Sequence, residues 1–392
     1  MSDKDIQSLM FNTACVGADD GFDSMKLKVF YQGKAAQIRI PSFIAPGKPS
    51  RASLDGSAVD LWGYATFDED GNDRFYSVGE EQENIIKTAQ DAFVTSPAAR
   101  VLLHHSIRLI LNQVNYNGED PVVCYTGLPV EKYYAGTARN DRFISKKLAN
   151  VDTSKSPNNA VTPLDSSLGP MPNIQFINCQ PEAVSAWYSY TVSVNDSLSL
   201  EPDHSKADKK IVVVDWGGRT IDIIPMHRGQ PDLAAKATLT DKGAIYLTDI
   251  LRQVLFETRD DIPMLDRLDH SVFRAALITG KINVFAHQFD IVAEREVALE
   301  RYRSAISPLI FSILENLTQY THVLFVGGPV EMILSDDHTL WAPKLMTRIV
   351  PTEEGLDPAM MNAEGLALNS IAAANALANK KMASLKAERK AS

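Results

Sequence analysis

An acid followed by two glycines ends an apolar run in the stretch VVVDWGGRTIDI, residues 212–223. A carboxylate at the end of a buried strand is costly to desolvate, so Asp215 needs a binding partner there. Gly217 and Gly218 permit a turn whose backbone can come close to a ligand. Taken alone, the stretch favours an ordinary hairpin with a Gly-Gly turn. Other parts of the chain shift the balance towards ligand binding.

A second stretch, GADDGFDSMKLKVFYQGKA at 17–35, repeats this pattern near the N-terminus. A shift of 196 places aligns Asp19 with Asp215, Gly21 with Gly217, Ser24 with Thr220 and Gly33 with Gly229. Each copy predicts a strand, a Gly turn, a strand, a second Gly turn and a third strand.

Two further pairs of segments follow in the same order. VVCYTGLPVEKY (122–133) and HVLFVGGPVEMI (322–333) match at a shift of 200, and each predicts a strand, a Gly turn and a helix with Pro at its start. The helices QPEAVSAWYSY (180–190) and NAEGLALNSIA (362–372) match more weakly, through Glu182 and Glu364. Three pairs in one order indicate two copies of one α/β unit, with a mixed sheet covered by helices.

Two facing copies would place both Gly turns on opposite walls of one cleft. Backbone N–H groups in such turns bind phosphate oxygens. The acids at the strand ends would repel a polyphosphate unless a cation lay between them, and magnesium suits this role because it keeps several waters and takes one or two carboxylates. Lys26 follows the first turn and can neutralise phosphate as a point charge. The turn at 326–329 opens a helix and would approach the sugar and base.

These segments resemble the motifs of the actin-like ATPase superfamily, and most closely those of the ParM-like plasmid-segregation actins. ADDGFDSMKL and VVVDWGGRTIDI resemble the two phosphate motifs, and YTHVLFVGGPVEMI resembles the adenosine motif. PEAVSAWY and NAEGLALNS resemble the two connecting helices. The five motifs run from about residue 17 to 370 in the expected order, so the resemblance covers nearly the whole chain.

The resemblance implies an α/β, actin-like ATPase fold, in which two duplicated ribonuclease-H-like domains flank a nucleotide cleft. The expected segments are a first actin-like domain at 12–190, a polar linker loop at 191–210, a second actin-like domain at 211–360, and a connecting helix with a basic tail at 361–392. The expected activity is magnesium-dependent hydrolysis of ATP, with GTP as the alternative nucleotide, coupled to filament assembly.

The resemblance also assigns roles to single residues. Glu182 and Asp215 would orient the attacking water, and Asp215 together with Asp19 would hold Mg²⁺, mostly through water. Asp20 is placed beside that metal, and Lys26 against the β/γ phosphates. The nucleotide-binding set is Asp20, Gly21, Ser24, Lys26, Gly217, Gly218, Arg219, Thr220, Asp222, Gly243, Gly327, Gly328 and Pro329.

Four positions depart from the family pattern. Phe22 and Asp23 stand where ParM-like proteins have small hydroxyl residues. Arg219 replaces a small hydroxyl residue in the second turn, and Pro329 replaces a small residue in the adenosine turn. Arg219 is therefore expected to contact either phosphate or a neighbouring subunit.

Within this superfamily the resemblance to ParM-like proteins implies a filament that segregates plasmid DNA. A DNA-binding adaptor, similar to ParR, would link the filament to centromere DNA, and the chain itself would bind no specific DNA. The alternatives are another bacterial actin-like filament, for cell shape or organelle positioning, and a small-molecule kinase. We find no motif for a kinase's substrate pocket or base. A chaperone-type ATPase would need a substrate-binding domain, for which the chain leaves no room after its second connecting helix.

The composition is compatible with these expectations. The 392 residues predict two or more domains, and 45% hydrophobic with 22% charged residues is typical of a soluble globular protein. An N-terminus that is acidic before it is apolar differs from a secretory signal, so we expect a cytoplasmic protein without membrane association. The net charge of −10 argues against DNA binding by the body of the protein.

Two other features predict ordinary packing. Cys15, Cys124 and Cys179 are odd in number and far apart, which indicates reduced, mostly buried thiols rather than disulfides or a zinc site. His104 and His105 are adjacent, and adjacent residues on a helix do not share a face. We therefore expect one of these histidines to be buried and the other to be solvated.

Overall fold

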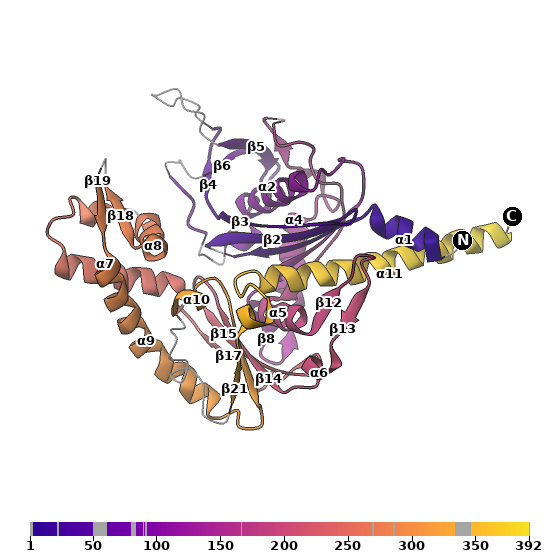
Figure 1. Cartoon of the computed structure of the whole chain (residues 1–392). Coiled ribbons are helices and arrows are strands. Elements are labelled where there is room, and N and C mark those ends of the chain that lie inside the picture. Colours follow the sequence, from indigo (N-terminus) through magenta and orange to yellow (C-terminus); the bar gives the residue numbers. More distant parts are fainter. Residues whose placement is uncertain are drawn as a thin grey trace. The chain divides into compact units, whose positions relative to one another are not determined.

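The computed structural model describes residues 3–21, 23–49, 61–79, 84–88, 90, 92–165, 167–268, 270–284, 287–333 and 346–391. The chain divides into two compact units, whose elements are labelled in Figure 1. Unit 1 comprises Met1–Asp208, His227–Ala234 and Met360–Ser392, and unit 2 comprises Lys209–Met226 and Ala235–Ala359.

The main sheet of unit 1 has the strand order β11-β7-β1-β2-β3. Its strands are β1 (Ala14–Asp20), β2 (Ser24–Tyr31), β3 (Lys34–Pro41), β7 (Val122–Leu128) and β11 (Ile174–Pro181). β1 is antiparallel to β2 and parallel to β7, and β11 is parallel to β7. β1 and β7 are buried along nearly their whole length, as expected for central strands covered on both faces.

Helices cover both faces of this sheet because successive strand residues point in opposite directions. Val16 belongs to the core that contains α2 (Pro97–Gln113), whereas Cys15 belongs to the core that contains α11 (Met361–Ala391). α11 lies very close to β1, since a Cβ added at Gly17 would come within 2.1 Å of the Ala363 carbonyl oxygen.

α2 also packs against a second sheet of unit 1, with the order β10-β5-β6-β4. This sheet consists of β4 (Ile44–Pro46), β5 (Trp62–Phe67), β6 (Asp73–Val78) and β10 (Thr162–Pro163). The other elements of unit 1 are α1 (Asp3–Phe11), α3 (Val130–Tyr133), β8 (Tyr134–Ala135), β9 (Ala138–Arg139), α4 (Asp141–Val151), α5 (Glu182–Thr191), β12 (Val192–Val194), β13 (Leu200–Pro202), α6 (His204–Ala207) and β16 (Gln230–Pro231).

Unit 2 repeats the topology of the main sheet of unit 1. Its strands are β14 (Ile211–Trp216), β15 (Ile221–His227), β17 (Ala237–Leu239), β20 (His322–Val326) and β21 (Thr347–Ile349). β14 is antiparallel to β15 and parallel to β20, as β1 is to β2 and β7. The matching topology confirms the predicted duplication of one α/β unit.

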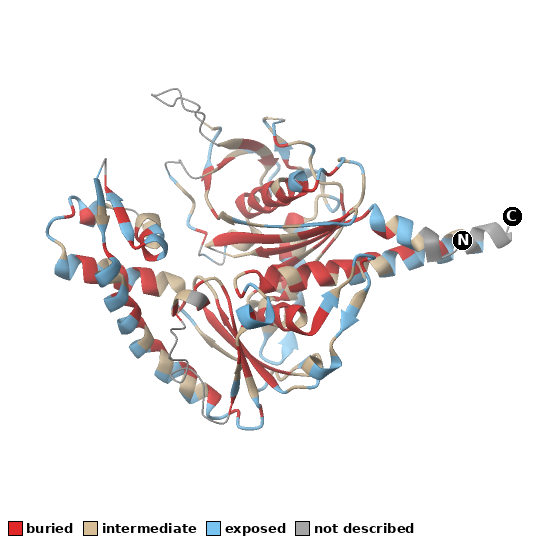
Figure 2. Ribbon diagram, in the orientation of Figure 1, coloured by how far each residue is buried: buried red, intermediate tan, exposed pale blue. Residues whose placement is uncertain are grey.

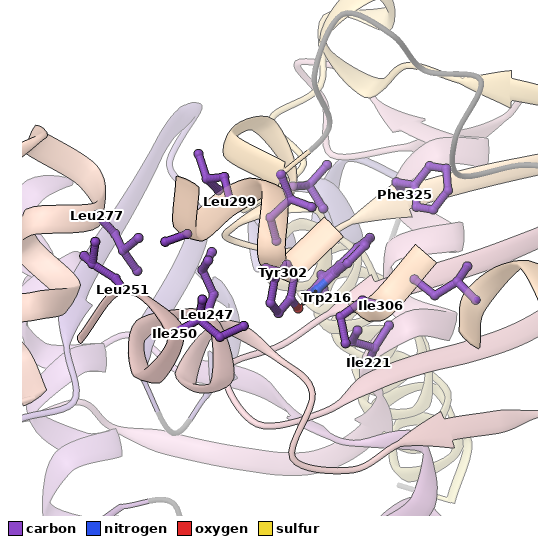
Figure 3. Packing of buried hydrophobic residues seen from close by; sticks show 14 of the residues in the cluster. Trp216, Ile221, Leu247, Ile250, Leu251, Leu277, Leu299, Tyr302, Ile306 and Phe325 are labelled. Carbon is purple, nitrogen blue, oxygen red and sulfur yellow. Dashed lines mark hydrogen bonds between the residues drawn. The ribbon is translucent and has the colours of Figure 1, made fainter. Parts of the chain in front are cut away.

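The core of unit 2 lies between this sheet and two long helices. The helices are α7 (Ala244–Thr258), α8 (His270–Thr279), α9 (Val292–Leu314) and α10 (Val330–Ile333), and β18 (Lys281–Val284) pairs with β19 (His287–Asp290). Figure 2 shows the strands and the inner faces of these helices as buried. Figure 3 shows how Trp216 of β14 and Phe325 of β20 pack with Leu247 of α7 and Tyr302 of α9.

Two predictions differ from the structure. Both histidines are buried: His104 hydrogen-bonds the Val151 carbonyl at 2.9 Å, and His105 hydrogen-bonds the Tyr64 hydroxyl at 2.8 Å. The reason is that α2 lies between two sheets and therefore has no fully solvated face. The segment predicted as a linker loop at 191–210 instead forms the β12–β13 hairpin, because Leu198 is buried against the α11 core.

The three cysteines are free and buried, which confirms the prediction. No helix among the described residues is long and apolar enough to cross a membrane.

Candidate functional site

Asp19 forms an ion pair across the first Gly turn. Asp19 lies opposite Lys26 in the antiparallel register of β1 and β2, and the Lys26 ammonium lies 3.0 Å from the Asp19 Oδ2. Both side chains are buried. A phosphate at this turn would therefore meet a lysine that is already held in place by the acid preceding the turn.

Asp20 points to the opposite face of β1 and has a different cation. The Lys147 ammonium, from α4, lies 2.7 and 2.8 Å from the two Asp20 carboxylate oxygens. The Thr126 hydroxyl donates to the same carboxylate at 2.5 Å, and Lys147 also donates to the Gly127 carbonyl at 2.6 Å. Asp20 thus ties β1 to β7 and α4.

Lys147 was not among the predicted site residues, and its side chain is only 2% exposed. Burial lowers the pKa of Lys147, but nearby acidic groups, led by Asp20, outweigh burial and the net shift is upward. The position of Lys147 in α4 is nevertheless a sequence signal for a buried ion pair. Ile144, Lys147 and Val151 are the buried residues of α4 and follow one helical stripe, so a lysine here needs a buried anion.

Glu182 begins α5 and packs over Gly127 at the end of β7. A Cβ added at Gly127 would lie 2.8 Å from the Glu182 Cγ and 2.9 Å from its Oε1. Glycine at position 127 therefore makes room for the Glu182 side chain, while the Gly127 carbonyl accepts a hydrogen bond from Lys147. Unit 1 thus brings the buried Lys147 together with Asp20 and Glu182, which are both half-buried.

The rest of the first turn is held by Ser42. The Ser42 hydroxyl donates to the Gly21 carbonyl at 2.8 Å, and its N–H donates to the Asp23 carbonyl. Ser24 is buried opposite Pro41 in the β2–β3 register. Phe22, which was expected to alter the phosphate contacts, lies outside the described residues.

The second turn places two acids side by side. Asp215 and Asp222 are directly opposite in the β14–β15 register, and both are buried. The Gly217 N–H donates to the Thr220 carbonyl at 2.9 Å and closes the turn. Asp222 accepts hydrogen bonds from the hydroxyls of Thr238 and Thr220, at 2.5 and 3.5 Å.

The N-terminus of α7 binds the carbonyl side of this turn. The N–H groups of Ala244 and Ile245 donate to the carbonyls of Gly217 and Gly218, at 3.1 and 2.9 Å. A Cβ added at Gly243 would lie 2.4 Å from the Gly217 carbonyl oxygen, so no larger residue fits. The Gly217 and Gly218 carbonyls therefore point to α7. Carbonyl oxygens repel anions, so this orientation is required if the other side of the turn is to bind a phosphate.

Arg219 lies in the second turn and pairs with Asp241. Its Nε donates to the Asp241 carboxylate at 2.8 Å, and the arginine side chain is 32% exposed. Its carbonyl accepts from the N–H groups of both Lys242 and Gly243 at 3.1 Å.

The third Gly turn packs against the end of β14. Gly327 has a φ of +113°, and a Cβ there would lie 2.2 Å from the Trp216 carbonyl oxygen, so both backbone conformation and space require glycine. Its N–H donates to the Pro358 carbonyl at 2.8 Å. Gly328 and Pro329 then lead into α10, where the Pro329 carbonyl accepts from Met332 and Ile333. Within unit 2, this turn and the Gly217–Gly218 turn therefore both lie at the end of β14.

A magnesium ion at this site would take most of its ligands from water and phosphate oxygens. Among the described residues, no group of three or more His, Cys, Asp or Glu side chains is placed to hold a metal. Asp215 offers one buried carboxylate at a strand end. One or two carboxylates with several retained waters is a common arrangement for Mg²⁺, so the donor set fits that ion.

Comparisons with known proteins give structural matches only. No protein-family model and no curated protein matches the chain. A 15-stranded ParM filament from Clostridium botulinum matches with a TM-score of 0.63 and 20% identity, over 92% of this chain and 99% of that chain. The chain has the actin-like fold.

Other matches have the same actin-like fold. Bacillus thuringiensis ParM with ATP matches with a TM-score of 0.60 and 15% identity, over 92% of this chain and 98% of that chain. The archaeal actin homologue Ta0583 matches with a TM-score of 0.58 and 16% identity, over 90% of this chain and 97% of that chain. These matches confirm the fold class that the five sequence motifs predicted.

Proposed function

We propose that the protein is a nucleotide-dependent, polymerising actin-like ATPase. The observation that carries the proposal is the repeated site element. In each unit a buried acid is the second-to-last residue of the central strand and a Gly turn follows the strand, with Asp19 in unit 1 and Asp215 in unit 2. In an actin-like fold, such a pair of turns is suited to the phosphates of Mg–ATP.

In this proposal, the residues of the two units have separate tasks. Lys26 and the turn amides neutralise and position the phosphates, and Gly327 and Gly328 approach the adenosine. Asp215 and Glu182 orient the attacking water. Phosphoryl transfer is mainly positioning and charge stabilisation, so rigidly held acids and amides are suitable catalytic groups. When bound, Mg²⁺ would supply charge neutralisation beside Asp215 and Asp19.

The proposed cellular role is plasmid segregation in the cytoplasm, through dynamic filaments of this chain. The matched structures that are named ParM support this choice. A filament for cell shape or organelle positioning is the alternative within the same class, and a small-molecule kinase is the alternative outside it. The structure of each unit gives no specific observation in favour of either alternative.

Pelleting and phosphate release together test the proposal against a kinase. With Mg–ATP the protein should pellet at high speed and release phosphate without any acceptor. With ADP or without nucleotide it should remain in the supernatant. A protein that stays in the supernatant under all conditions but phosphorylates an acceptor from a panel of sugars and carboxylates would be a kinase instead.

The proposed partner is a DNA-binding adaptor. The acidic chain repels phosphate, and its one concentrated basic stretch is the C-terminal segment from Lys380 to Lys390. We expect the adaptor to insert an amphipathic helix into an apolar groove, a contact that ATP should strengthen. A gel shift with centromere DNA of the same plasmid should therefore require the adaptor. A sequence-specific shift by the pure protein would contradict this assignment, and loss of the adaptor-dependent shift in a form without the basic stretch would move the partner site to 380–390.

A further inference from the structure

Trp216 and Tyr302 form a buried hydrogen-bonded pair behind the second Gly turn. The Trp216 Nε1–H donates to the Tyr302 hydroxyl at 2.7 Å, and Figure 3 shows the two side chains next to each other, with their rings tilted by 42°. Both side chains have no solvent exposure. Tyr302 comes from the middle of α9, 86 residues along the chain from Trp216.

The Tyr302 hydroxyl also donates to the Lys242 carbonyl at 2.5 Å. Lys242 is the residue whose N–H, with that of Gly243, donates to the Arg219 carbonyl in the turn. The backbone of the turn and these hydrogen bonds therefore form a closed path, which we call the Trp216 circuit. The backbone leads from Trp216 to Arg219, and hydrogen bonds then lead from Arg219 to Lys242, from Lys242 to Tyr302, and from Tyr302 back to the Trp216 indole.

Packing alone would not require this hydroxyl. A phenylalanine at position 302 would keep the ring contacts with Trp216 and Tyr246, whose centroids lie 6.4 and 6.0 Å from that of Tyr302. What phenylalanine lacks is a group that accepts from an indole and donates to a carbonyl at the same time. Without that group, the buried Trp216 indole N–H and the partly buried Lys242 carbonyl would each lose this hydrogen bond, and such a loss is costly for a buried group.

We propose that Tyr302 is a positioning residue for the 217–220 turn, acting on it through the Trp216 circuit. The inference rests on the proposed function, in which that turn surrounds the phosphates of ATP. Burial raises the pKa of Tyr302 above its ordinary value of 10, so its hydroxyl remains a donor to Lys242 at neutral pH.

The test is Tyr302→Phe, with Tyr246→Phe as the matched control. Tyr246 lies in the first turn of α7 and contacts the Tyr302 ring, but its hydroxyl contributes no hydrogen bond to the Trp216 circuit. Hydrogen exchange is measured on the nucleotide-free proteins over peptides 238–248 and 293–313. Phosphate release at saturating Mg–ATP and ATP affinity are measured on the same proteins.

Tyr302→Phe should speed hydrogen exchange in 238–248 by about tenfold, because the Lys242 carbonyl loses its hydrogen bond from the Tyr302 hydroxyl. Exchange in the α9 peptide 293–313 should stay within about twofold. Phosphate release at saturating ATP should fall about tenfold, with a smaller change in ATP affinity. The reason is that a more mobile turn would still contact the phosphates but would orient them less well. Tyr246→Phe should behave like the wild type in all three measurements.

Unchanged exchange in 238–248, or equal acceleration throughout α9, would overturn the inference and leave Tyr302 as a packing residue. Phosphate release equal to that of the wild type would also overturn it. A wild-type protein that releases no phosphate would instead defeat the proposed function. Since the exchange experiment needs no nucleotide, the two failures are distinguishable.

Discussion

Replacing Lys147 by methionine would leave the Asp20 carboxylate, whose side chain is only 15% exposed, without its cation. Lys147 contacts both carboxylate oxygens and the Gly127 carbonyl, all within 2.8 Å, and its side chain is 2% exposed. Removing one partner from a buried ion pair costs about 3–5 kcal/mol, because the remaining charge is desolvated and uncompensated. The Thr126 hydroxyl still donates to Asp20, so we expect a loss near the lower end, at about 3 kcal/mol.

The double variant Asp20→Asn/Lys147→Met separates charge from packing. It removes both charges and nearly preserves the volume, so no buried charge is left unpaired. Neutral replacements of a buried ion pair are often close to neutral in stability. We therefore expect the double variant to recover more than half of the stability lost by Lys147→Met.

Urea unfolding followed by circular dichroism measures both effects, with Lys155→Met as the control. Lys155 also pairs with an acid, Asp152 at 4.0 Å, but its side chain is 67% exposed, so its removal should cost less than about 1 kcal/mol. If Lys147→Met unfolded within about 1 kcal/mol of the wild type, or if the double variant were less stable than the single one, the assignment of a buried, mutually dependent pair would be wrong.

Three further predictions concern the two acids that we propose to be catalytic, the contact between the second Gly turn and α7, and the buried His105. Asp215→Ala should lose most phosphate release while it still binds ATP, whereas Glu182→Ala should slow release and leave filaments that persist longer. Rates near wild type would reduce either acid to a structural role. Gly243→Ala should destabilise the protein by about 1–3 kcal/mol and weaken ATP binding, because the φ of −75° suits any residue but the added Cβ meets the Gly217 carbonyl. Binding equal to wild type by nucleotide titration would contradict this. Burial lowers the pKa of His105 to about 3, below its ordinary value of 6.5, so the unfolded chain binds more protons in this range and stability should decrease as the pH falls from 6.5 towards 3. His105→Gln should reduce that slope by up to about 1.4 kcal/mol per pH unit in urea titrations, and an unchanged slope would mean that His105 does not stay neutral in the fold.

The sequence predicted the features that lie in local stretches of chain. Strand, Gly turn and strand are contiguous in residues 17–35 and 212–223, so their pattern predicted both the duplication and the actin-like fold. The turn at Gly327 was predicted for the same reason, because its strand, glycines and proline are contiguous in residues 322–333.

Contacts between distant elements were not predicted. Lys147 meets Asp20 only because the fold places α4 beside the end of β1, 127 residues away in the chain. Large aromatic residues such as Trp216 and Tyr302 are common in any hydrophobic core. Nothing in the sequence around either residue predicts that the two form a hydrogen bond. The histidine prediction was wrong because it assumed one solvated helix face, whereas α2 packs against two sheets.

We propose that ATP drives assembly of this chain and that hydrolysis reverses it. Light scattering and phosphate release, recorded in one sample after addition of limiting Mg–ATP, test this claim most directly. We predict that scattering rises at once, that phosphate appears with a delay, and that scattering returns to its baseline when the ATP is consumed. Phosphate release without any rise in scattering, or a scattering signal that is equal with ADP, would contradict the account.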